Sequence, residues 1–173
     1  MGVYDAISSL VNLVTRKPSE QVLRGRLLEE ASKWVGLTDI RGVDVFRQAV
    51  DGVAEGEPWC AAFVQYCVSA TAIRNKASIS LYPSELCSAI WDNTPKNYRL
   101  EDPIPGSIII WNYPGTIKGH TGIVLKVLND GAHIKTIEGN TKEKDGVVGV
   151  HTKLRDVKGT AGMRVLGFLK PFK

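Results

Sequence analysis

The hydrophobic pattern of this chain changes its period once, near Pro105. Upstream of that point, apolar residues recur three and four positions apart, as they do on one face of an α-helix. Downstream, the apolar runs are short and β-prone, and turn-forming residues separate them. These runs are residues 106–111, 121–128, 132–137, 147–153 and 165–169. Helices followed by a meandering antiparallel sheet predict an α+β domain in which the helices pack on the sheet.

The upstream part contains three expected helical segments. Ser19 is a suitable N-cap for a helix that ends near Gly36. Residues 43–50 can form a further turn or two, and a longer helix is expected over residues 60–71. A Gly-rich acidic loop, residues 51–58, leads into that longer helix.

Residues 1–18 form an N-terminal extension ahead of the domain that we expect over residues 19–173. The extension has the apolar spacing of a short amphipathic helix, which Pro18 would end. Its apolar stripe can dock on the domain, or it can contact a membrane or a partner. It lacks the basic start and continuous apolar core of a secretory signal, so the cytoplasm of the producing cell is the expected site of synthesis.

The composition is that of one globular domain. Lys and Arg number 22 against 18 Asp and Glu, which gives a formal net charge of +4. The basic residues are scattered, without the clusters and interleaved aromatics of a nucleic-acid reader, so no nucleic-acid partner is expected. The chain has three cysteines, and Cys60 and Cys67 would lie about 10 Å apart on one helix, beyond disulfide reach. We therefore expect free thiols. The protein is also expected to be a monomer.

Cys60 follows a Pro-Trp pair and would occupy the first turn of its helix. There the positive end of the helix dipole and unpaired backbone N–H groups favour a thiolate, the form of cysteine that attacks a carbonyl carbon. The same amides could hold a developing oxyanion. Cys67 and Cys87 are interpreted as core thiols, with Cys87 in a region that can border the cleft.

A thiolate nucleophile needs a nearby imidazole, and His120 is the candidate. It follows Gly119 and opens a predicted strand, so its ring would project from a strand end as a general base and then a general acid. The turn at residues 129–131 predicts that this strand forms a hairpin with the strand carrying Glu138 and Asn140. Two residues apart, these side chains would share a face, and either could orient the imidazole. Glu138 is favoured because a carboxylate also stabilises the imidazolium, which leaves Asn140 as a helper or a polar wall of the cleft.

Four motifs follow one another along the chain: PWCAAFV (58–64), PGSII (105–109), GHTGIV (119–124) and IEGNT (137–141). Together with GFLKP (167–171), they resemble those of the CHAP family, the cysteine- and histidine-dependent amidohydrolases/peptidases of the papain-like group. The resemblance covers roughly residues 20–173 and implies a papain-like fold of the CHAP/NlpC-P60 type. Matched position by position, it places the nucleophile on Cys60, the base on His120, the orienting acid on Glu138 and the family asparagine on Asn140.

The family resemblance also implies the substrate, which is bacterial peptidoglycan. The bond would be the N-acetylmuramoyl-L-alanine amide or an amide within the stem peptide or cross-bridge. Ser107 stands where many members carry an acidic residue, a departure interpreted as structural. The acidic loop lacks the dense Asp pattern with which some relatives bind calcium, so Asp51, Glu55 and Glu57 are interpreted as solvated. No metal or other cofactor is assigned.

A small basic wall hydrolase made in the cytoplasm resembles a phage endolysin, which waits in the host cell and then reaches the wall. A secreted antibacterial effector of the same chemistry is an alternative, as is a papain-like amidase or peptidase with a non-wall substrate. A module that binds without cutting is the competing class, and the intact Cys, His, Glu and Asn set argues against it.

Aromatic residues near the motifs are the candidates for substrate contact. Trp59, Trp111 and Tyr113 could line a groove, because aromatic faces cover sugar and peptide surfaces at low entropic cost. His133 and His151 are interpreted as sheet residues, since no Cys, His or Asp spacing around them suggests a zinc site.

Overall fold

The computed structural model describes residues 17–38, 40–50, 56–129, 131–143, 145–160 and 162–173. The helix expected near the N-terminus and most of the acidic loop, including Asp51 and Glu55, lie outside these residues. The helices are α2 (Glu20–Ser32), α3 (Ile40–Arg47), α4 (Cys60–Asn75), α5 (Cys87–Asn93) and the 3-10 helix η1 (Lys96–Tyr98). The strands are β1 (Arg99–Leu100), β2 (Ile108–Asn112), β3 (Gly119–Val127), β4 (His133–Lys142), β5 (Val148–Asp156), β6 (Gly159–Thr160) and β7 (Met163–Leu169).

The helix ends follow local chemistry. Ser19 caps α2 as predicted, because its side chain accepts a hydrogen bond from the backbone N–H of Val22. The helix ends at Ser32, before the predicted stop at Gly36, whose amide instead donates to the Val150 carbonyl at 2.8 Å. Helix α4 continues past the predicted end to Asn75, after which the chain turns through a left-handed residue.

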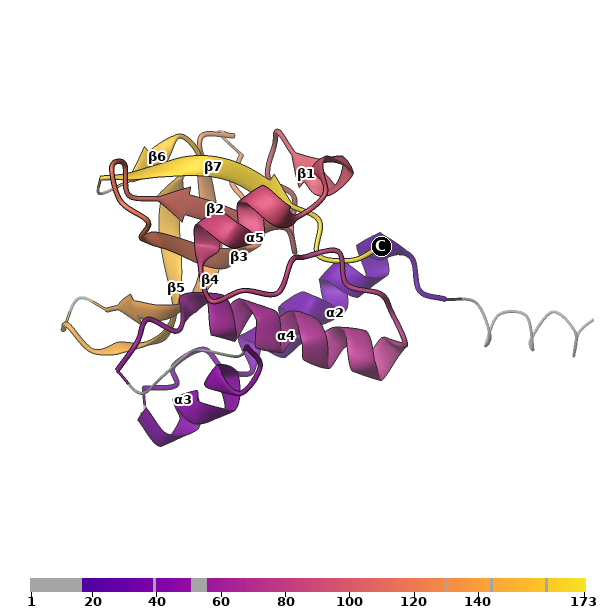
Figure 1. Cartoon of the computed structure of the whole chain (residues 1–173), viewed down its shortest axis with the longest axis horizontal. Helices are drawn as coiled ribbons and strands as arrows, with labels where there is room; N and C mark the ends of the chain where they lie inside the picture. Colours follow the sequence, from indigo (N-terminus) through magenta and orange to yellow (C-terminus); the bar gives the residue numbers. More distant parts are fainter. Residues whose placement is uncertain (1–16, 39, 51–55, 130, 144, 161) are drawn as a thin grey trace, which may run out of the picture.

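All strand pairs of the described chain are antiparallel, in the order β1-β7-β2-β3-β4-β5, with β6 paired to β7. Helix α4 lies across one side of the sheet with α2 packed on it, and α5 lies near β2 and β3 (Figure 1). This arrangement confirms the α+β prediction of helices packed on an antiparallel sheet. The predicted hairpin of the His120 and Glu138 strands is also present, as β3 and β4.

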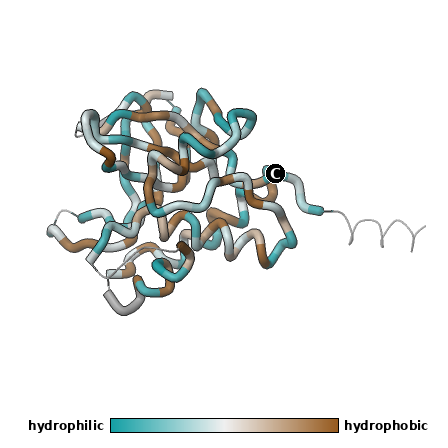
Figure 2. The backbone as a smooth tube through the Cα atoms, in the orientation of Figure 1, coloured by the Kyte–Doolittle hydropathy of each residue, from teal (hydrophilic) through white to brown (hydrophobic). Residues whose placement is uncertain are grey.

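The two faces of the sheet bury different apolar clusters. One face packs against the helices, and the other encloses a second cluster under the strongly curved strands. In β2 the residues alternate between them, with Ile108 and Ile110 toward the helices and Ile109 and Trp111 in the second cluster. Hydrophobic and hydrophilic stretches alternate along both layers (Figure 2), as expected of elements that each bury one face. None of the described helices is long and apolar enough to cross a membrane.

Candidate active site

Cys60 is the first residue of α4, and its side chain is buried. The first amides of a helix have no intrahelical acceptor, so unpaired N–H groups are found at the end of α4 where this residue lies. Helix α4 approaches β4 closely because Gly139 has no side chain. A Cβ at that position would lie 2.6 Å from Cβ of Phe63 and 2.7 Å from the Trp59 ring. Backbone packing therefore brings the start of α4 against the strand that carries Glu138.

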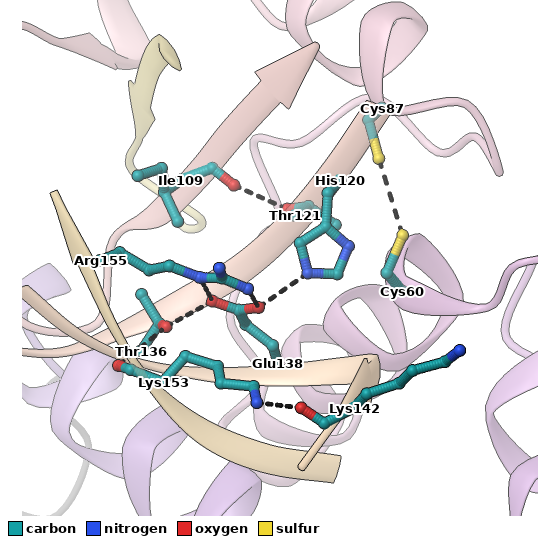
Figure 3. A network of polar contacts seen from close by, with 10 residues as sticks. All are labelled: Cys60, Cys87, Ile109, His120, Thr121, Thr136, Glu138, Lys142, Lys153 and Arg155. Atoms are coloured by element: carbon teal, nitrogen blue, oxygen red, sulfur yellow. Dashed lines mark hydrogen bonds and ion pairs between the residues drawn. The ribbon is translucent and has the colours of Figure 1, made fainter. Parts of the chain in front are cut away.

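His120 lies near the start of β3, between the helix and the neighbouring strand. Its Nε2 is 2.8 Å from Oε2 of Glu138, and Figure 3 shows its other ring nitrogen facing the Cys60 sulfur. An ionised carboxylate only accepts hydrogen bonds, so Nε2 carries the proton and Nδ1 faces the thiol. The ring stacks on Trp111, with centroids 5.6 Å apart and an interplanar angle of 23°. Its orientation is thus held from two sides.

Glu138 is fully buried in β4 and is held by three side chains. Thr136 donates its hydroxyl to Oε1 at 2.6 Å, and Arg155 donates Nε to Oε1 at 2.8 Å and Nη2 to Oε2 at 2.5 Å. Gly122 makes room for the carboxylate, because a Cβ there would lie 2.7 Å from Cγ of Glu138. The carboxylate that orients His120 is itself fixed through both oxygens.

Charge balance keeps this buried carboxyl ionised. Burial by itself would raise the pKa of Glu138, but hydrogen bonds from Arg155 and His120, together with their positive charges, hold the pKa at about 2. In return, the hydrogen bond and negative charge of Glu138 raise the pKa of Arg155, although burial by itself would lower it. Glu138 is therefore a carboxylate at any pH at which the protein is expected to work.

The thiol and the imidazole shift each other toward the ion pair. A hydrogen bond with Cys87 lowers the pKa of Cys60 well below its usual value against the effect of burial, and His120 lowers it further. Burial alone would lower the pKa of His120, but its contacts with Cys60 and Glu138 raise it to about 9. A thiolate next to an imidazolium is the resting form of an activated cysteine nucleophile.

Asn140 is not placed as predicted. The register of β4 against β5 shifts between Glu138 and Thr141, and Asn140 has a left-handed backbone with φ of 54°. This irregularity breaks the alternation from which a shared face with Glu138 was predicted. Within the described part of the chain, Asn140 makes no side-chain hydrogen bond to His120, and the polar group that orients the ring is Glu138.

Two of the three aromatic residues predicted to line a groove are buried. Trp59 is 5% exposed and stacks on Phe46, and Trp111 is fully buried beneath His120. The prediction is wrong for these two, because neither leaves an aromatic face open to a substrate. Tyr113, which follows β2, is 38% exposed and can still contact a substrate.

Arg155 and Thr136 were not predicted at this site, and Cys87 was expected only in a region that can border the cleft. Arg155 was grouped with scattered surface charges, yet it lies on β5 and reaches back to Glu138 on the adjacent strand. The strand predicted at residues 147–153 ended two residues before Arg155. A longer strand paired with the strand of Glu138 would have indicated that Arg155 lies near the carboxylate. The Cys87 sulfur lies 4.0 Å from that of Cys60, a contact between separate helices that no local motif encodes.

The remaining candidates have structural surroundings. All three cysteines are free and buried, and Cys67 lies in the core on α4. Ser107 is buried and donates its hydroxyl to the Ile104 carbonyl at 2.7 Å, which is consistent with its structural interpretation. His151 pairs with Glu143 at 3.4 Å. Among the described residues no group of three or more His, Cys, Asp or Glu side chains could hold a metal ion.

A buried cysteine at a helix start, an imidazole beside it and a carboxylate behind the imidazole, on a helix-covered antiparallel sheet, define a cysteine hydrolase of the amidase/peptidase class. The family model of the CHAP domain matches residues 52–140, just over half of the chain. The chain belongs to the CHAP family, as its motifs predicted. Comparison with curated proteins gives no match.

Proposed function

We propose that this protein hydrolyses an amide bond of bacterial peptidoglycan, with Cys60 as nucleophile, His120 as base and acid, and Glu138 as the orienting carboxylate. The observation that carries the proposal is the hydrogen-bonded line from Glu138 through His120 toward the Cys60 sulfur. Membership of the CHAP family supports the amide substrate and the wall polymer. The bond is the N-acetylmuramoyl-L-alanine amide or a peptide bond of the stem or cross-bridge.

The site geometry suggests the order of proton transfers. The Cys60 thiolate attacks the carbonyl carbon, and the backbone amides at the start of α4 stabilise the oxyanion that forms. The imidazolium of His120 then gives its proton to the leaving amine, which releases the amine and leaves an acyl-enzyme. A water molecule, deprotonated at Nδ1 of His120, hydrolyses the thioester and restores the thiolate.

Glu138 contributes by holding the ring through Nε2. Its negative charge stabilises the imidazolium before the amine departs, and it stays ionised throughout because Arg155 compensates its burial. Tyr113 is the exposed aromatic side chain that we propose for substrate contact.

For the biological role, we propose a phage endolysin that is made in the host cytoplasm and acts on the wall after release. The small basic domain and the wall-directed family support this role. A secreted antibacterial effector would use the same chemistry. We propose that the enzyme works as a monomer with peptidoglycan as its partner, and that the N-terminal segment can contact a membrane.

The test is digestion of purified peptidoglycan by the wild type, by Cys60→Ala and by a matched control, Cys67→Ala, which changes a core thiol on the same helix. Wild type and Cys67→Ala should release fragments, and Cys60→Ala should release none while remaining folded by circular dichroism. Mass spectrometry of the new amino termini identifies the bond. Fragments released equally by Cys60→Ala would refute the nucleophile. If the wild type hydrolysed soluble amides but not peptidoglycan, and Cys60→Ala hydrolysed neither, the result would favour a non-wall substrate.

A further inference from the structure

Two cysteine sulfurs face each other at the candidate active site. Cys60 and Cys87 are the first residues of α4 and α5, and their sulfur atoms lie 4.0 Å apart (Figure 3). Both residues are only 4% exposed. The two helices thus begin at the same point, each with a thiol directed at the other.

Packing holds Cys87 in this place. A Cβ on Gly119 would lie 2.8 Å from Cβ of Cys87 and 2.6 Å from the Trp111 carbonyl oxygen. The absence of a side chain on Gly119 therefore lets α5 approach the strand of His120 closely enough for Cys87 to reach the nucleophile.

The two thiols differ in reactivity. Cys60 has thiolate character. Cys87 stays a thiol, because its hydrogen bond with Cys60 and its burial raise the pKa of Cys87. A thiolate reacts with peroxides, and a neighbouring thiol can then resolve the product. Any cleft that admits an amide carbonyl to the Cys60 sulfur also admits hydrogen peroxide, which is smaller.

We propose that Cys60 and Cys87 form an oxidative modification site, at which a peroxide converts the two thiols into a reversible disulfide that blocks the nucleophile. The Cys60 thiolate attacks one peroxide oxygen, the O–O bond breaks, and the departing hydroxide takes the His120 proton to form water. Cys60 is then a sulfenic acid. The Cys87 sulfur attacks the Cys60 sulfur, the S–O bond breaks, and the hydroxide leaves with the Cys87 proton as a second water. The peroxide gains two electrons, and each cysteine loses one.

The required movement is small. A disulfide needs a sulfur separation of about 2 Å, so from 4.0 Å each sulfur moves by about 1 Å. Rotation about the two Cα–Cβ bonds can supply this movement. Cys67 provides an internal comparison, because it lies two turns further along α4, buried in the core, where burial together with the charge of Glu30 raises its pKa.

The disulfide would protect as well as inhibit. Without a resolving thiol, a sulfenic acid proceeds to sulfinic and sulfonic acids, which thiol reductants do not reverse. The inference deepens the proposed function, under which the enzyme meets its substrate outside the reducing cytoplasm, where disulfides persist.

The experiment treats the full-length protein with one equivalent of hydrogen peroxide, blocks free thiols with iodoacetamide after denaturation, and maps the peptides by mass spectrometry. The expected product has lost two hydrogen atoms, links Cys60 to Cys87 and leaves Cys67 alkylated. Turnover should be lost completely and should return with dithiothreitol. Cys67→Ala should behave in the same way.

The Cys87→Ser variant separates a resolving role from simple proximity. In this variant the same treatment should add oxygen to Cys60. Dithiothreitol should not restore activity to the molecules in which Cys60 has become a sulfinic acid. Oxygen on Cys60 with a free Cys87 in the wild type, or no oxidation of Cys60, would overturn the inference. Because the mass measurement needs no substrate, a protein that forms the disulfide but never cuts peptidoglycan would contradict only the proposed function.

Discussion

Arg155 is the residue whose removal tests the charge balance of the site most directly. It places two charge-assisted hydrogen bonds on Glu138, which is fully buried, and its own side chain is 14% exposed. Arg155→Met keeps much of the side-chain length and removes the charge. Removing one partner of a buried pair costs about 3–5 kcal/mol, and we take the lower end, about 3 kcal/mol, because the His120 imidazolium remains.

The expected result is a large loss of thermal stability. For a protein of this size 1 kcal/mol corresponds to about 2–4 °C in Tm, so Arg155→Met should unfold roughly 6–12 °C below wild type. Loss of the positive charge should also raise the pKa of both Glu138 and His120, which moves the alkaline limit of activity upward. Arg155→Lys keeps the charge but not the bidentate geometry, so its Tm should lie between those of wild type and Arg155→Met.

Thermal denaturation followed by circular dichroism, with a pH–rate profile of the same samples, measures both effects. The matched control is Arg164→Met on β7, where the arginine is exposed and the change should alter stability by at most about 0.5 kcal/mol. A double-mutant cycle with Glu138→Gln should give a coupling of about 2 kcal/mol or more. If Arg155→Met has the Tm and pH profile of wild type, the reasoning about Glu138 is refuted.

Three further predictions concern neighbouring residues. The pKa of Glu138 is lowered from 4.5 to about 2 by folding. The ionised carboxylate therefore contributes about 3 kcal/mol to the free energy of unfolding above pH 4.5, and this contribution is lost as the pH falls toward 2. Acid titration of stability should therefore be less steep in Glu138→Gln, and an unchanged slope would contradict this. Because the pKa of His120 is about 9 and its proton goes to the leaving amine, kcat/KM should fall as the pH rises through 9; a profile flat to pH 10 would argue against His120 as the acid. Gly139→Ala places a Cβ 2.6 Å from that of Phe63, so it should destabilise the protein by about 1–3 kcal/mol in urea denaturation. The control is Gly115→Ala, at a turn where a Cβ meets no other atom and the change tests only backbone strain.

The order of the main helices and strands, and the residues of the Cys, His and Glu motifs, followed from the sequence because they depend on local features. Helix α5 and the short elements η1, β1 and β6 were not predicted. Ser19 caps its helix through a residue three positions away, and the β3–β4 hairpin follows from a short turn between two apolar runs. The positions of Cys60 at a helix start and His120 near a strand start are local in the same sense. Such features involve few residues and little loop closure, so spacing is enough to predict them.

Other parts of the site were decided only by tertiary structure. Arg155 reaches Glu138 from the adjacent strand, and Cys87 reaches Cys60 because two helices separated by a loop begin at one point. Trp59 is buried because α3 places Phe46 against it, and Asn140 departs from the predicted face because a register shift interrupts the strand. In each case the outcome depends on packing between segments distant in sequence, where the volume of several side chains and the irregularity of one strand act together. The sequence by itself predicted Cys60, His120 and Glu138 as the candidate residues, and the fold determined which partners set their charge.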